Sequence, residues 1–125
     1  MAVRVELVEP AFDDLKRYSK SGSIQLFLAQ LLRIEEQGEK AGYPLGKGLT
    51  GWRKIVVGDR DWRIVFRLNE TYTVATVWVI GDRADARCYA EAQRRIESLG
   101  KDTPGGMSLA AALVRLTQRQ RPRRR

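Results

Sequence analysis

Histidine is absent from the 125-residue sequence, and cysteine occurs only once, as Cys88. Without histidine, a Ser-His-Asp triad and imidazole acid–base catalysis are both excluded. A single cysteine excludes an intrachain disulfide and any zinc site built from several cysteines. We expect Cys88 to be a small buried hydrophobe rather than a reactive thiol. An enzyme of this composition must therefore rely on lysine, arginine, tyrosine and carboxylate groups.

Long apolar runs are also missing, since no stretch approaches the roughly 20 residues that span a bilayer. The first ten residues contain no basic region followed by an apolar segment. We therefore expect no secretory signal, no membrane partner and a cytoplasmic location. No glycine-rich phosphate-binding fingerprint is present, and the glycines mark turns instead. The hydrophobic fraction of 43% is enough to form a core.

Positive charge is in excess, with 23 Lys+Arg against 15 Asp+Glu and a net charge of +8. Five of these charges are the arginines of residues 119–125. Such a tail is either a solvated end or an arm that binds nucleic acid or a protein partner, and the sequence leaves both open. Without these arginines the net charge would be +3, so charge alone does not indicate a nucleic-acid-binding protein.

The hydrophobic pattern predicts one α+β domain over residues 1–98. Alternating apolar residues predict strands at 3–7, 53–57, 62–68 and 72–80. Helical spacing predicts helices at 9–18, 24–37 and 84–99. Two N-terminal helices would cover one face of an antiparallel sheet, in the order β-α-α-β-β-β-α. Residues 99–125 would add a linker, a C-terminal helix near 107–118 and the Arg-rich tail. This helix could pack on its own domain, mediate self-association or receive a partner.

Alternation within residues 62–68 places Arg63 and Arg67 on the face of the sheet away from the helices, because the larger apolar set must face the core. Val65 shares that open face. In the preceding strand Ile55 and Val57 join the core, while Lys54 and Val56 point to the open face. A concave basic surface could therefore form from four residues: Lys54, Arg63, Arg83 and Tyr89. The alternatives are that the arginines are solvated or paired with Glu70, Asp82 or Asp85, and that Tyr89 only packs between helix and sheet.

Three segments, taken in order and at their spacing, resemble the RelE/ParE toxin superfamily of bacterial toxin–antitoxin systems. They are residues 49–55 (LTGWRKI), 61–66 (DWRIVF) and 79–89 (VIGDRADARCY). The first is similar to a turn that leads into a basic strand. The second is similar to an aromatic-arginine-aliphatic strand, and the third to a strand followed by glycine, arginine and tyrosine. The resemblance covers about residues 3–97.

The resemblance implies a RelE-like mRNA interferase, a ribosome-dependent endoribonuclease that cuts mRNA in the decoding site without a metal or other cofactor. Arg63, Arg83, Tyr89 and Lys54 match its catalytic set. The family's second strand lysine falls at Val56, a departure that leaves the strength of catalysis open. Guanidinium groups would stabilise the phosphorane transition state, with Lys54 or Tyr89 as the base. We expect further RNA contacts from four arginines: Arg53, Arg60, Arg67 and Arg87.

The resemblance also implies a cognate antitoxin as partner, in a toxin–antitoxin hetero-oligomer. Two rival functions remain open. The chain could be a ParE-like inhibitor of DNA gyrase that does not cut RNA, although ParE-type members typically lack this arginine–tyrosine set. It could also be an inactive or repurposed scaffold, such as a DNA-binding co-repressor.

Overall fold

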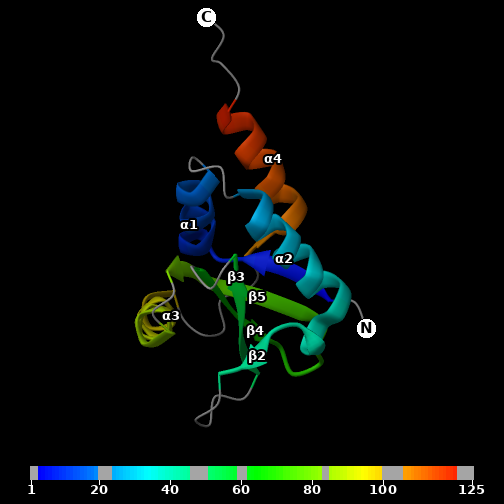
Figure 1. Cartoon of the computed structure of the whole chain (residues 1–125), viewed down its shortest axis with the longest axis vertical. Coiled ribbons are helices and arrows are strands. Elements are labelled where there is room, and N and C mark those ends of the chain that lie inside the picture. Colours follow the sequence, from blue (N-terminus) through cyan, green and yellow to red (C-terminus); the bar gives the residue numbers. More distant parts are fainter. Residues whose placement is uncertain are drawn as a thin grey trace, which may run out of the picture.

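The computed structural model describes residues 3–19, 24–45, 51–58, 62–82, 85–99 and 106–120. Four α-helices, one 3₁₀ helix and six strands lie within these residues (Figure 1). In chain order they are β1 (Arg4–Leu7), α1 (Glu9–Ser19), α2 (Ile24–Gln37), η1 (Gly38–Lys40), β2 (Tyr43–Pro44), β3 (Trp52–Val57), β4 (Trp62–Leu68), β5 (Val74–Asp82), α3 (Asp85–Leu99), β6 (Met107–Ser108) and α4 (Leu109–Gln120). The predicted α+β order is confirmed, and two short strands, β2 and β6, are added to it.

The strands form one sheet in the order β2-β3-β4-β5-β1-β6. Its β2 to β5 part is antiparallel, as predicted, but β1 pairs in parallel with β5, so the sheet is mixed. Sequence alternation could not reveal this, because direction within a sheet depends on pairing between distant segments. A bulge in β5 leaves Trp78 between Val79, which pairs with Val65, and Val77, which pairs with Phe66.

Helices α1 and α2 cover one face of the sheet, as the hydrophobic pattern predicts (Figure 1). Phe12 and Leu15 of α1 and Phe27, Leu31 and Ile34 of α2 are fully buried there. They pack on the core-facing residues of the central strands, which are Ile55, Val57, Ile64, Phe66 and Ile80. An aromatic cluster closes one end of this core, where the ring of Phe27 lies 5.0 Å from Tyr18 and 5.4 Å from Trp62.

Helix α3 packs on the opposite face of the sheet, over β4 and β5 (Figure 1). The prediction of an open face is therefore only partly right, because α3 covers a part of it. A Cβ atom on Gly81 would lie 3.0 Å from the Cys88 sulfur, which shows how closely the first turn of α3 approaches β5. Val65 does point to this face, but it is only 2% exposed because α3 covers it. Cys88 is buried among these apolar side chains, as predicted.

The C-terminal segment packs on its own domain. Strand β6 pairs with the outer edge of β1, and Leu109, Ala112 and Leu116 of α4 are buried against the body. Arg115 lies 4.4 Å from the centre of the Phe12 ring and forms an ion pair with Glu9 at 3.1 Å. Of the three arrangements left open by the sequence, the structure therefore shows the packing of this helix on its own domain.

Gly106 permits the close approach of β6 to β1. A Cβ atom at this position would collide with the Leu7 carbonyl oxygen, and the Gly106 amide donates a hydrogen bond to Glu6 Oε1 at 3.1 Å. We expect Gly106→Ala to release β6 and α4 from β1 at a cost of about 1–3 kcal/mol, the scale of an overpacked contact. Limited proteolysis should then cut the α4 segment faster while the body stays protected. Cleavage at the wild-type rate would contradict this assignment.

Candidate functional site

The strand register brings Lys54 and Arg63 to the same face of two neighbouring strands. Arg63 lies opposite Val56 on β3 and opposite Gly81 on β5, while Lys54 lies opposite Val65. Lys54 and Arg63 are therefore diagonal neighbours, with Cβ atoms about 7–8 Å apart for this arrangement. Both side chains are half-buried, and Arg63 Nη1 donates a hydrogen bond to the Trp62 carbonyl at 3.2 Å. A guanidinium and an ammonium group thus share one surface.

Tyr89 lies on α3, the helix that packs over β4 and β5. Residues two apart on a helix, such as Arg87 and Tyr89, project to opposite flanks. Arg87 lies on the flank that faces α1, where it lines a cavity between the two helices. The flank that carries Tyr89 is therefore the one turned away from α1, on the side of β4. The Tyr89 hydroxyl accepts a hydrogen bond from Gln93 Nε2 at 2.9 Å, which fixes the ring along the helix. Sequence analysis did not single out Gln93. Its position four residues after Tyr89 could have indicated the contact, because side chains at this spacing are neighbours on a helix.

The other predicted site residues fall into three groups. Arg83, which directly follows β5 in the chain, and Arg60 lie outside the described residues. Arg67 lies on the same face as Arg63, but four residues further along β4, which places it roughly 14 Å away. Its guanidinium lies 5.8 Å from the centre of the Trp52 ring. Arg53 lies on the other face, and its guanidinium donates hydrogen bonds to the carbonyl oxygens of Ala41 and Gly42, both at 2.8 Å. Its placement favours a structural role in holding the chain after η1.

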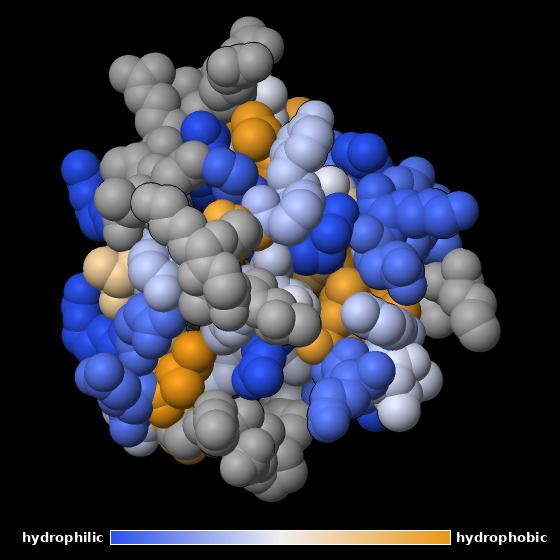
Figure 2. All heavy atoms as spheres, turned by 90° about the horizontal axis from the view of Figure 1, so that it is seen from below, coloured by the Kyte–Doolittle hydropathy of each residue, from blue (hydrophilic) through white to orange (hydrophobic). Residues whose placement is uncertain are grey.

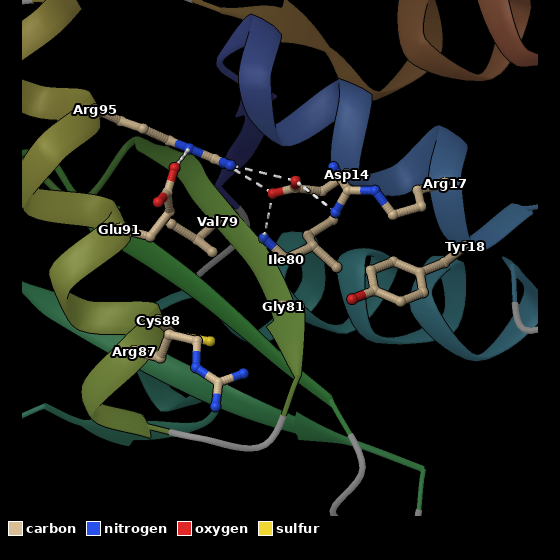
Figure 3. A pocket seen from close by; sticks show the side chains of 10 residues that line it. All are labelled: Asp14, Arg17, Tyr18, Val79, Ile80, Gly81, Arg87, Cys88, Glu91 and Arg95. Carbon is tan, nitrogen blue, oxygen red and sulfur yellow. Dashed lines mark hydrogen bonds and ion pairs between the residues drawn. The ribbon is translucent and has the colours of Figure 1, made fainter.

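A cavity of about 340 Å³ opens between α1 and α3, along the last residues of β5 (Figure 3). Arg17 and Tyr18 enter it from α1, and Arg87 and Glu91 enter it from α3. In Figure 3 the Tyr18 hydroxyl and the Arg87 guanidinium approach the Gly81 stretch of β5 from opposite sides. The cavity therefore begins at the residue that lies opposite Arg63 in the sheet.

A charged network forms the inner end of this cavity. Asp14 is 2% exposed, and its Oδ2 accepts hydrogen bonds from Arg95 Nη1 at 2.8 Å and from the Ile80 amide at 3.0 Å. Arg95 also binds Glu91 Oε2 and the Trp78 carbonyl. Burial opposes the charge of Arg95, but hydrogen bonds and charge attraction from Asp14 and Glu91 outweigh it, so the pKa of Arg95 lies above its usual value. The network thus joins α1, β5 and α3.

The surface on the side away from α4 is largely hydrophilic, with smaller apolar patches between the polar groups (Figure 2). Within the described residues, no three His, Cys, Asp or Glu side chains are grouped to hold a metal ion. No helix in the described part of the chain is long and apolar enough to cross a membrane.

Comparisons with known proteins found similarity in structure only. No protein-family model matches the sequence. No curated protein matches it either.

Three solved structures illustrate the similarity. A free mutant of the Escherichia coli toxin RelE is 23% identical and superposes with a TM-score of 0.58, covering 77% of this chain and 99% of its own. The RelBE2 toxin–antitoxin complex of Mycobacterium tuberculosis contains a chain that is 17% identical, with a TM-score of 0.55 over 66% of this chain and 100% of that one. The ParDE toxin–antitoxin system of Pseudomonas aeruginosa contains a chain that is 12% identical, with a TM-score of 0.52, and the superposition covers 65% of this chain and 96% of that one.

Proposed function

Because the chain has the fold of the RelE and ParE toxins, we propose that it is the toxin of a toxin–antitoxin system and acts as a ribosome-dependent mRNA endonuclease. The observation that supports nuclease activity is the shared face of Lys54 and Arg63, with Tyr89 on the flank of α3 that is turned away from α1. These groups offer positive charge and a proton-transfer group in one place, which RNA cleavage without histidine requires.

The reaction proposed for this site is an internal transfer at phosphorus. The 2′-oxygen of the nucleotide attacks the adjacent phosphate, and its proton passes to Lys54 or Tyr89. The bond from phosphorus to the 5′-oxygen breaks, and the leaving oxygen gains a proton, so the products are a 2′,3′-cyclic phosphate and a 5′-hydroxyl. Arg63 would stabilise the phosphorane, which carries more negative charge than the diester. Arg83 would hold the phosphate or assist the leaving group, and the decoding site would position the RNA.

A cognate antitoxin is proposed as the protein partner, in a toxin–antitoxin hetero-oligomer. Structures with the same fold include RelE bound to an antitoxin RelB peptide and the RelBE2 complex. The excess of basic residues suits an acidic antitoxin segment. Such a complex would operate in the cytoplasm, where both translating ribosomes and the antitoxin are found.

A ParE-like inhibitor of DNA gyrase is the second candidate. The similarity to a chain of the ParDE system favours it, as does Val56, which stands where the RelE resemblance implies a second lysine. Val56 lies opposite Arg63, so this departure removes one positive charge from the centre of the proposed nuclease site.

Primer extension on mRNA from translating ribosomes distinguishes the two candidates. We expect the wild-type chain to produce cuts at codon positions in the reading frame, and Arg83→Ala to abolish them. Arg33→Ala is the matched control, since Arg33 is exposed on α2, where it binds Gln30 and Gln37. Growth arrest with intact mRNA and trapped gyrase–DNA complexes would instead support the ParE-like function.

A further inference from the structure

The cavity between α1 and α3 lies along the edge of β5 that faces away from β4, at a part of that edge where no strand of the described chain pairs. Strand β1 pairs with β5 only from Val74 to Val77. Beyond Val77, side chains rather than a strand bind the backbone groups of this edge. Asp14 accepts a hydrogen bond from the Ile80 amide, and Arg95 donates one to the Trp78 carbonyl oxygen. Charged side chains on a strand edge oppose the addition of a strand from another protein. The floor of this cavity is therefore poorly suited to an extended peptide.

The charges of the cavity suit a small anion. Five charged side chains line it, three arginines and two carboxylates, which leaves one net positive charge. Asp14 and Glu91 are both bonded to Arg95, so Arg95 offsets much of their repulsion of an anion. Arg17 reaches the mouth from α1, where its side chain is 65% exposed and pairs with Asp14 at 3.5 Å, and Arg87 reaches the mouth from α3. One phosphodiester group carries a single negative charge, and the volume of about 340 Å³ is near the lower limit for ligand pockets.

The position of the cavity connects it to the proposed cleavage site. Gly81 lines the cavity and also pairs with Arg63, and Cα atoms of paired antiparallel residues lie about 5 Å apart. Among the described residues, the first turn of α3 approaches Gly81 most closely, at Cys88. An RNA strand that is held at Arg63 and continues past this turn would present a neighbouring phosphate to Arg17 and Arg87.

We infer that the α1–α3 cavity is a phosphate subsite for an RNA nucleotide next to the one that is cut, with Arg17 and Arg87 as its ligands. The inference rests on the proposed nuclease function and adds an RNA-binding site outside the catalytic face. Arg17 and Arg87 bind and position the RNA here, and neither takes part in the bond-breaking step.

The test uses the full-length chain with Arg17→Ala, Arg87→Ala and the double variant, beside Arg33→Ala as the control. We expect KM for ribosome-bound mRNA to rise about fivefold per single substitution, the scale of one exposed ion pair, while kcat stays within about twofold. Binding of a 2′-O-methyl RNA oligonucleotide, which cannot be cut, should lose about 0.7 of its logarithmic salt slope per substitution. Arg17→Lys, which keeps the charge, should recover most of the affinity. Thermal unfolding of each variant checks that the fold is intact.

The outcomes separate this inference from the proposed function. If the wild-type chain cuts mRNA but the variants match Arg33→Ala in KM and salt slope, the subsite is wrong and the function stands. If the wild-type chain does not cut, the proposed function fails, and the oligonucleotide alone decides whether the cavity binds RNA. Unchanged RNA binding together with weaker binding of an acidic antitoxin peptide would assign the cavity to a protein partner and overturn the inference.

Discussion

Replacing Arg63 with alanine should reduce mRNA cleavage on the ribosome by about 100- to 1000-fold, the usual effect of removing one preorganised charge donor from a transition state. Arg63 lies at the centre of the candidate site, between Val56 and Gly81, and shares its face with Lys54. The loss should appear in kcat, because the guanidinium interacts more strongly with the phosphorane than with the diester. Single-turnover cleavage on programmed ribosomes measures it directly.

Two matched variants make this result specific. Arg63→Lys keeps the charge but loses the planar fork that binds two phosphoryl oxygens, so it should restore only part of the activity. Arg67→Ala removes an arginine from the same face of the same strand, but beside Trp52 rather than Gly81. It should raise KM more than it lowers kcat. Full cleavage by Arg63→Ala would show that the catalytic site lies elsewhere on the chain.

The sequence was sufficient to place Lys54 and Arg63 on one face, because strand alternation has a fixed period of two and the apolar set must face the helices. The same reasoning assigned Ile55 and Val57 to the core, and both are buried. The second helix was predicted to span residues 24–37, and it does end at Gln37. These features depend on residues that are near one another in the chain.

Features that depend on distant residues could not be predicted in this way. Alternation does not show that α3 returns to cover Val65, or that β6 closes the edge of β1 more than 100 residues later. Alternation places Arg53 on the same face of β3 as Ile55, but its hydrogen bonds to the chain after η1 depend on how β2 and β3 meet. The cavity between α1 and α3 likewise exists only once both helices are placed.

The sequence contained an indication that Asp14 forms a buried ion pair. Asp14 lies three residues after Ala11 and one before Leu15, so it falls on the apolar side of its helix. An acidic residue at such a position indicates a buried partner. The partner lies 81 residues away, and only the fold identifies it as Arg95.

Asp14→Ala should destabilise the folded chain by about 3–5 kcal/mol, because it leaves Arg95 without its main counter-charge and the Ile80 amide without an acceptor. Asp13→Ala is the control on the same helix, since Asp13 is exposed and pairs with Lys16 at 3.2 Å. It should change the free energy of unfolding by less than about 0.5 kcal/mol. Urea unfolding of both variants measures the difference, and equal midpoints would show that the network is not a major source of stability.

A double variant separates the loss of a favourable pair from the penalty of leaving one charge buried. Replacing both partners with apolar residues, as Asp14→Leu with Arg95→Met, removes the uncompensated charge and should recover a large part of the stability lost in Asp14→Ala. The network also ties α3 to α1 and β5, and α3 carries Tyr89. The double variant should therefore fold well yet hold Tyr89 less firmly, so we expect its kcat for mRNA cleavage to fall while its unfolding midpoint lies well above that of Asp14→Ala. A restored midpoint with unchanged kcat would show that the network serves stability alone.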